Sequence, residues 1–310
     1  MRAARLGAGE ANRTMKTLVT GSTGLVGRAL CARLRERGDE VLRLVRRTPS
    51  AADEVQWDPM EGTCDAAAFD VDAIVHLAGE NIASRRWSKG QMLKIRESRV
   101  AGTRLISEGA VRITRRPKVL VSASAIGFYG DRGEERLDEG SARGGGFLAD
   151  VCADWELATD QARRSGLRVV HPRIGMVLAS GGGALEKMLL PFRLGLGGRI
   201  GSGKQWMSWV QLDDLVRILC HMIDDEEMSG PVNAVAPGAV TNAEFTRALG
   251  RVLRRPTLFP LPAFMARLVM GKMADELLLS SARVAPAALE SAGFKFLHPE
   301  IQGGLEASIS

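Results

Sequence analysis

Residues 17–27, TLVTGSTGLVG, decide the fold of this 310-residue chain. The first four residues are typical of a short apolar strand. Leu25, Leu30 and Leu34 then lie at helical spacing, so a helix is expected directly after the glycines. The three glycines between strand and helix are spaced G-x-x-G-x-x-G. A strand, a glycine turn and a helix in this order are typical of the first unit of a dinucleotide-binding domain.

The same turn predicts a phosphate site. Glycine lets a backbone approach a pyrophosphate closely, and the N-terminus of the following helix supplies N–H groups and a partial positive charge. The alternative is an ordinary strand-to-helix turn without a ligand. The residues expected to bind a dinucleotide here are Gly21, Ser22, Thr23, Gly24, Leu25, Val26 and Gly27.

Strand and helix patterns alternate beyond the turn. Strands are expected at 41–45, 55–57, 73–77, 118–123 and 167–172, and helices at 89–110 and 150–164. This alternation predicts an α/β fold, a Rossmann-type doubly wound parallel sheet with helices on both faces.

The alternation weakens after residue 178, where glycine-rich segments begin. Helical patterns return at 215–222, expected to be capped by Asp213 or Asp214, and at 245–252. The expected domains are a disordered leader over 1–14, a Rossmann domain over 15–178 to which 208–237 returns, and a smaller C-terminal α/β lobe on the substrate side, formed by 179–207 and 238–310.

Composition excludes several classes of protein. The apolar stretches fall short of the ~18 to 20 residues that a membrane span needs, and the charge of +6 includes no polybasic run. We therefore expect neither a membrane span nor a nucleic-acid partner. The four cysteines lie far apart, which indicates no metal site and no disulfide framework, and residues 1–14 lack the apolar core of a secretory signal. A reducing, cytoplasmic location fits these features.

Arg46 and Arg47 follow the second expected strand, about 20 residues beyond the glycines. An NAD enzyme has a carboxylate at this place to hold the ribose 2′-hydroxyl. A guanidinium can instead chelate a 2′-phosphate through two N–H donors, so NADP(H) is favoured over NAD. Two solvated arginines at a strand end are the alternative.

His76, Leu77 and Ala78 stand where the fourth expected strand ends, at the edge where open α/β sheets bind ligands. We expect them to contact the cofactor, together with Ser98 on the following helix. For His76 the alternative is a satisfied core histidine.

These motifs, TGSTGLVG, HLAG, VLVSASAIGFYG and the late strand RVVHPRIGMVL, resemble the extended branch of the short-chain dehydrogenase/reductase superfamily. More narrowly, the block LLPFRLGLGGRIGSGKQWMSWVQLDDL is similar to an atypical subgroup labelled only epimerase family proteins. The resemblance covers about residues 15–306. It implies a Rossmann fold with bound NADP, Pro172 among the cofactor contacts and a small C-terminal domain, but no particular substrate.

The chain departs from that superfamily at the acid/base pair. Members normally use a tyrosine, with a lysine four residues later that lowers the pKa of the tyrosine. Tyr129 is the only tyrosine of this chain, and residue 133 is a glycine. The resemblance aligns Phe147 and Val151 with the pair, and a phenyl ring cannot transfer a proton.

The remaining catalytic candidates are Ser124, which matches the superfamily serine after the fifth strand, and Tyr129, with Asp150 nearby. Two functions follow. One is an NADP-dependent oxidoreductase or epimerase acting on an unknown small molecule. The other is a non-catalytic NADP(H)-binding sensor or scaffold. By analogy with the fold, a homodimer is a further expectation.

Overall fold

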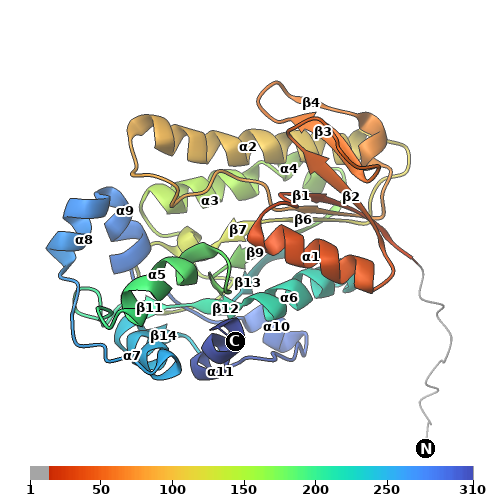
Figure 1. Ribbon diagram of the computed structural model, residues 1–310. Coiled ribbons are helices and arrows are strands. Elements are labelled where there is room, and N and C mark those ends of the chain that lie inside the picture. Colours follow the sequence, from red (N-terminus) through yellow and green to blue (C-terminus); the bar gives the residue numbers. More distant parts are fainter. Residues whose placement is uncertain (1–13, 310) are drawn as a thin grey trace, which may run out of the picture.

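The computed structural model describes residues 14–309, so the leader predicted over 1–14 lies, except for Thr14, outside the described residues. A central sheet carries helices on both of its faces, with a smaller lobe beside it (Figure 1). The order of strands in the sheet is β13-β9-β6-β5-β1-β2-β3-β4. These strands are β1 (Lys16–Thr20), β2 (Glu40–Val45), β3 (Glu54–Asp58), β4 (Thr63–Cys64), β5 (Ala73–His76), β6 (Val119–Ser122), β9 (Arg168–Ile174) and β13 (Gly230–Ala234).

Neighbouring strands are parallel throughout, except that β4 runs antiparallel to β3. A short strand, β7 (Ser124–Ala125), continues beyond β6 and pairs with β9. The order rises on both sides of β1, so the chain reverses its direction of travel between β1 and β5. Ligands of doubly wound folds bind at such a switch point, outside the carboxyl ends of the strands.

The two faces of the sheet bury alternate side chains of the same strands. Val19 and Val75 pack with α1 (Leu25–Glu36) and α6 (Leu212–Asp224), whereas Leu18 and Ile74 pack under α2 (Lys89–Arg112). A strand buried on both faces must be apolar throughout, which explains the uninterrupted apolar runs of the sequence.

The helix expected over 150–164 is two helices. α3 (Phe147–Leu157) ends before Ala158, and α4 (Asp160–Arg164) begins after Thr159, whose hydroxyl donates to the Glu156 carbonyl. A threonine that bonds to the backbone of the preceding turn competes with continuation of the helix, and the periodicity alone did not reveal this break.

The C-terminal lobe is mainly helical, and its core contains Leu185, Phe192, Trp209, Phe245 and Leu305. Its elements are α5 (Gly183–Arg193), α7 (Asn242–Leu253), α8 (Ala263–Met270), α9 (Lys272–Ala274) with a π-helical turn (Asp275–Leu279), and α11 (Ile301–Ile309). Three two-stranded pairs complete it: β10 (Met176–Leu178) with β12 (Trp209–Gln211), β11 (Trp206–Met207) with β14 (Val240–Thr241), and β15 (Arg283–Val284) with β8 (Arg136–Leu137).

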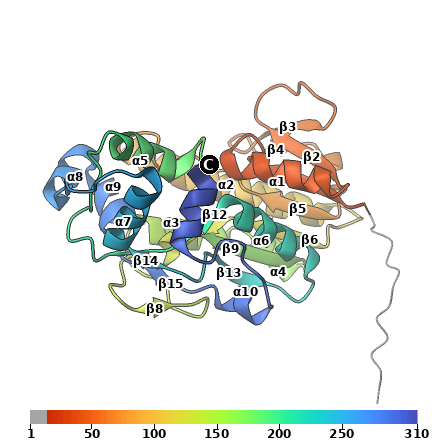
Figure 2. The ribbon, with the colours of Figure 1, turned by 60° about the horizontal axis from the view of Figure 1, so that its bottom comes forward.

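The segment between the two parts of the lobe lies with the central sheet, because α6 packs on α1 and β13 pairs with β9. A short helix, α10 (Ala287–Ser291), packs against β13. Figure 2 shows α5, α7, α8 and α9 gathered at one end of the molecule. No helix within residues 14–309 combines the length and the apolar character that crossing a bilayer requires.

Candidate functional site

The glycine turn depends on the absence of side chains at two positions. Gly21 has a φ of +68°, and a Cβ there would lie 2.9 Å from the carbonyl carbon and oxygen of Leu77. A Cβ on Gly27 would lie 2.2 Å from the Gly21 carbonyl oxygen. The first turn of α1 therefore packs directly on the end of β1, and β1 packs on the loop after β5.

The N-terminus of α1 is suited to an anion. Its N-cap residue, Gly24, offers no side-chain cap, and the first turn of the helix contains no acidic residue. The amides there keep their hydrogen-bonding capacity and the positive end of the helix dipole. In the same turn the buried Ser22 hydroxyl has no hydrogen-bond partner among residues 14–309. An orphaned hydroxyl beside uncapped amides fits a phosphate group.

The two arginines after β2 have different surroundings. Arg47 donates through both terminal nitrogens to Glu54, at 2.9 and 2.6 Å, and this pairing holds the pKa of Glu54 down at about 2. Arg46 is exposed and has no hydrogen-bond or ion-pair partner in the described part of the chain. The structure thus commits Arg47 to Glu54 and leaves the Arg46 guanidinium exposed to solvent.

A third cation stands near the turn. Arg28, on the second turn of α1, donates to the Thr23 carbonyl at 3.1 Å and pairs with no carboxylate among residues 14–309. The sequence interpretation missed it because Arg28 looks like one of the many solvated helix arginines. Its contact with Thr23 brings its guanidinium to the glycine turn.

His76 is fully buried at the end of β5, directly opposite Thr20 in the register of β1 and β5. Its Nδ1 lies 2.7 Å from the Thr20 hydroxyl, and burial lowers the pKa of His76 to about 3. The imidazole is therefore neutral. Of the two alternatives for His76, the structure favours the core residue over the cofactor contact.

Leu77 and Ala78 form the loop that follows β5, and both of their amides donate to the Thr20 hydroxyl oxygen at 3.1 Å. Ser98 accepts from the Glu80 amide at 3.0 Å. The loop is thus held from β1 on one side and from α2 on the other. Ser98 fixes this loop, and Leu77 and Ala78 remain half-buried beside the glycine turn.

Pro172 is buried inside β9, where its register partner is Val232 of β13, and the strand continues for two residues beyond it. It therefore lies below the edge of the sheet at which the other expected contacts gather.

Ser124 lies just beyond the carboxyl end of β6, and its hydroxyl donates to Glu156 at 2.7 Å. Glu156 also accepts from Arg173 at 2.8 and 2.9 Å, and the Arg173 side chain is only 4% exposed. Two elements, β7 and β9, and helix α3 thus meet in one buried polar network. The proton of Ser124 is committed to Glu156, which leaves the oxygen lone pairs of Ser124 as acceptors.

Tyr129 is not placed to transfer a proton at this edge, contrary to the expectation from the sequence. Its side chain is 0% exposed, and its hydroxyl lies 2.7 Å from Asn233 Oδ1 and accepts from Arg173 at 3.0 Å. Burial raises the pKa of Tyr129. Tyr129 is therefore a hydrogen-bonded residue of the protein core. Asp150, the neighbouring candidate, is an exposed partner of Arg143 at 2.8 Å.

Helix α3 carries the two residues that the resemblance aligns with the acid/base pair. Phe147 is its first residue, half-buried, and stacks edge-to-face on Trp87 with 5.1 Å between ring centroids. Val151 is buried one turn later. Both side chains are apolar, and neither can transfer a proton.

The C-terminal lobe reaches the same edge of the sheet. Both carboxylate oxygens of Glu276 accept backbone amides at the start of α3, from Phe147 at 2.9 Å and Leu148 at 2.7 Å. A Cβ on Gly182, before α5, would lie 3.3 Å from the Leu25 side chain of the glycine turn. The lobe therefore faces the carboxyl ends of the strands, where it can complete a binding site. No local signal in the sequence identifies Glu276 as a cap for a helix 129 residues away.

Comparison with known proteins places this geometry in context. Residues 17–235 match the model of the NAD-dependent epimerase/dehydratase family, and residues 261–308 match a domain of unknown function, DUF1731. The epimerase family protein ML0860 of Mycobacterium leprae is 45% identical over 293 residues, which cover 94% of this chain and 95% of that protein.

Two solved structures illustrate the range of similarity. The crystal structure of human epimerase family protein SDR39U1 (isoform 2) with NADPH matches with a TM-score of 0.86 at 35% identity, over 95% of this chain and 99% of that one. The Thermus thermophilus UDP-glucose 4-epimerase in complex with NAD matches with a TM-score of 0.73 at 19% identity, over 94% and 97% of the two chains. The second similarity concerns the fold alone.

Proposed function

Because the chain belongs to the NAD-dependent epimerase/dehydratase family, as its motifs predicted, we propose that it binds NADP(H) and acts as an oxidoreductase or epimerase on a small molecule. The observation that carries this proposal is the uncapped N-terminus of α1 beside the orphaned Ser22 hydroxyl. The crystal structure of the human relative with NADPH supports it. When bound, the cofactor supplies a nicotinamide C4 that gives or takes a hydride.

Arg46 selects the phosphorylated cofactor in this proposal. A charge-assisted contact between a guanidinium and a phosphate is worth about 2 kcal/mol, so Arg46→Asp should weaken NADPH binding at least ~30-fold and change NADH binding less than about threefold. Isothermal titration calorimetry with both cofactors tests this. Arg104→Asp, on the exposed side of α2, is the matched control. Equal losses of NADPH and NADH affinity would remove Arg46 from the site.

Ser124 is the residue that we propose to meet the substrate oxygen. Its lone pairs can accept a hydrogen bond from a substrate hydroxyl while its own proton points to Glu156. Removing a proton from that hydroxyl then requires Ser124 Oγ to accept it and to release its own proton to Glu156 Oε1. This route does not need the usual tyrosine. Once a substrate is known, Ser124→Ala should lower kcat about 100-fold or more while NADPH binding persists.

A non-catalytic NADP(H)-binding sensor or scaffold is the second candidate, and Phe147 and Val151 favour it because neither can transfer a proton. Absorbance at 340 nm separates the two functions when purified protein with NADPH is screened against carbonyl compounds and sugar nucleotides. Turnover of any substrate supports the enzyme. Tight NADPH binding without turnover across both libraries supports the sensor.

We further propose a reducing compartment, the cytoplasm, for this protein. All four cysteines are unpaired thiols, and burial raises the pKa of the Cys31 and Cys152 thiols. Protonated, buried thiols of this kind are inert and need no disulfide partner.

A further inference from the structure

The basic residues of this chain are concentrated in two segments. Residues 187–204 and 245–274 contain ten of the 42 lysines and arginines and none of the 36 aspartates and glutamates. The rest of the chain therefore carries 32 basic and 36 acidic residues, so the entire positive excess comes from these two segments. We call them together the basic surface.

The two segments lie side by side in the lobe. Arg255, just after α7, donates to the Arg193 carbonyl at the end of α5 at 2.9 Å, and Ile200 forms a parallel bridge with Leu261. The Leu261 amide donates to the Arg199 carbonyl at 2.9 Å. The charges of both segments thus belong to one region of the molecule.

The same two segments hold ten of the fourteen large apolar side chains that are exposed within residues 14–309. On α8 the buried residue is Ala266, whereas Phe264 is 67% exposed, Leu268 74% and Val269 72%. Leu258 before the helix is 75% exposed. Soluble monomers rarely present so many protruding apolar side chains in one region unless something covers them.

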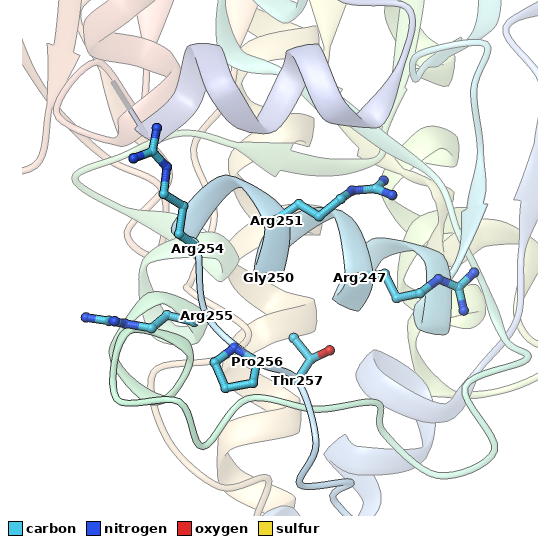
Figure 3. Close-up of a pocket in the computed structure, with 7 residues that line it drawn as sticks. All are labelled: Arg247, Gly250, Arg251, Arg254, Arg255, Pro256 and Thr257. Atoms are coloured by element: carbon cyan, nitrogen blue, oxygen red, sulfur yellow. The ribbon is translucent and has the colours of Figure 1, made fainter.

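Arginines lie just before this apolar stretch of the chain, which begins with the exposed Leu258. Arg247, Arg251, Arg254 and Arg255 line a pocket of about 470 Å³ at the end of α7, and Figure 3 shows their guanidinium groups fanning outward from it. None of the four forms a salt bridge within the described residues. Because they diverge, they suit an extended anionic surface better than a single phosphate.

We propose that the basic surface docks onto an anionic lipid bilayer, with Phe264 and Leu268 entering the headgroup region and the arginines around α7 binding lipid phosphates. Protruding apolar side chains with a cationic border are the signature of interfacial docking, which needs no spanning segment. A second copy of this chain fits less well, because a twofold interface through this surface would bring ten cations against ten cations.

Co-sedimentation with vesicles tests the proposal. The full chain should pellet with vesicles of phosphatidylcholine and phosphatidylglycerol at about 7:3, and much less with phosphatidylcholine alone. Arg251→Glu with Arg254→Glu should lower the partition coefficient at least ~25-fold, since each cation contributes about fivefold. Phe264→Ser with Leu268→Ser should lower it at least about tenfold. Raising the salt concentration to about 0.5 M should also weaken the binding of the unmodified chain to anionic vesicles.

Arg136→Glu and Leu157→Ser, exposed residues outside the basic surface, are the matched controls and should pellet like the unmodified chain. NADPH binding is measured for every variant in the absence of vesicles. It reports whether each variant is folded, independently of membrane binding. Failure to pellet with anionic vesicles, or pelleting of either double variant to the same extent as the unmodified chain, overturns the proposal. So does a concentration-dependent dimer that Phe264→Ser with Leu268→Ser abolishes, because a second copy then covers the surface.

Discussion

A single hydroxyl, that of Thr20, joins the ends of two neighbouring strands at the candidate site. It contacts His76 Nδ1 and accepts the amides of Leu77 and Ala78. Because both amides donate to its oxygen, the Thr20 proton is the one shared with Nδ1, and the imidazole proton is then on Nε2. The loop that borders the glycine turn therefore owes its position to one side chain.

Thr20→Val should destabilise the protein by about 2–4 kcal/mol. Valine has nearly the same shape, but it leaves two amides and one imidazole nitrogen without a partner at a fully buried position. Urea unfolding measures the loss. Thr20→Ser keeps the hydroxyl and should lose less than half as much; equal losses for the two variants would mean that the methyl group contributes as much to stability as the hydroxyl does.

His76 should contribute to the pH dependence of stability. Its pKa is about 3 in the folded protein and about 6.5 when exposed. The unfolded chain binds the proton more readily between these values, so stability is complete above about pH 6.5 and falls toward pH 3, with a slope of at most about 1.4 kcal/mol per pH unit.

Urea unfolding at pH 7 and pH 5.5 gives this slope, above the range in which carboxylates dominate. His76→Gln should flatten the slope over that interval, although it lowers stability at both pH values. An unchanged slope would assign the pH dependence to His171, whose pKa is also lowered by burial.

Single residues also show how far the sequence could be read. The glycines of the turn were predictable because only glycine tolerates such close backbone contacts. The role of His76 was open, and the burial of Tyr129 argues against the catalytic role expected of it; neither could be foreseen, since the partners of a buried polar side chain come from strands distant in sequence. The sequence does not distinguish Arg46 from Arg47, whereas in the structure Glu54 binds Arg47 alone of the two.

At the scale of secondary structure elements, helix α3 begins where a residue of the lobe caps it. Glu276 receives the first two amides of the helix. Glu276→Ala should lower the free energy of unfolding by about 1–3 kcal/mol, because a charge-assisted cap is lost where α3 meets the π-helical turn.

Hydrogen exchange at the amides of residues 147–150 should accelerate in Glu276→Ala and provide the local measurement. Asp275→Asn is the matched control, since Asp275 is exposed and pairs with Arg267. Faster exchange in both variants would contradict a specific cap.

Element boundaries were less predictable than element types. The cap of α6 is Gln211, whose side chain accepts the amides of Asp213 and Asp214; neither aspartate caps the helix as expected. Asp214 instead accepts the amides of Leu297 and His298, at 2.8 Å each. The Asp214 carboxylate therefore binds a loop 83 residues away in the sequence, and no local pattern could indicate this contact.

At the scale of the whole molecule, the α/β class was predicted correctly because a repeated alternation of strands and helices allows few topologies. The charge distribution was not predicted: the sequence shows no polybasic run, whereas the fold brings together in the lobe two segments that contain basic but no acidic residues. The hydrogen bonds around Tyr129 also join the central sheet to the lobe, because Asn233 in β13 donates to the Ala285 carbonyl beyond β15.

Tyr129→Phe should therefore destabilise the protein by about 1–3 kcal/mol and leave the NADPH dissociation constant within about twofold. Thermal unfolding and calorimetry on the same preparation measure the two quantities. Unaltered stability combined with loss of turnover would instead return Tyr129 to a catalytic role.

The pairing of β15 with β8 also constrains how the molecule is made. β8 lies in the first half of the chain and β15 near its end, so a ribosome must release almost the whole polypeptide before this pair can close. The nascent Rossmann sheet can assemble earlier, once β13 has emerged. Residues 245–274 leave the ribosome between these two events. The side chains of α7 that are buried in the folded lobe, Phe245 and Leu249 among them, then stay uncovered until Leu305 follows, so the nascent chain depends on chaperones most at that moment.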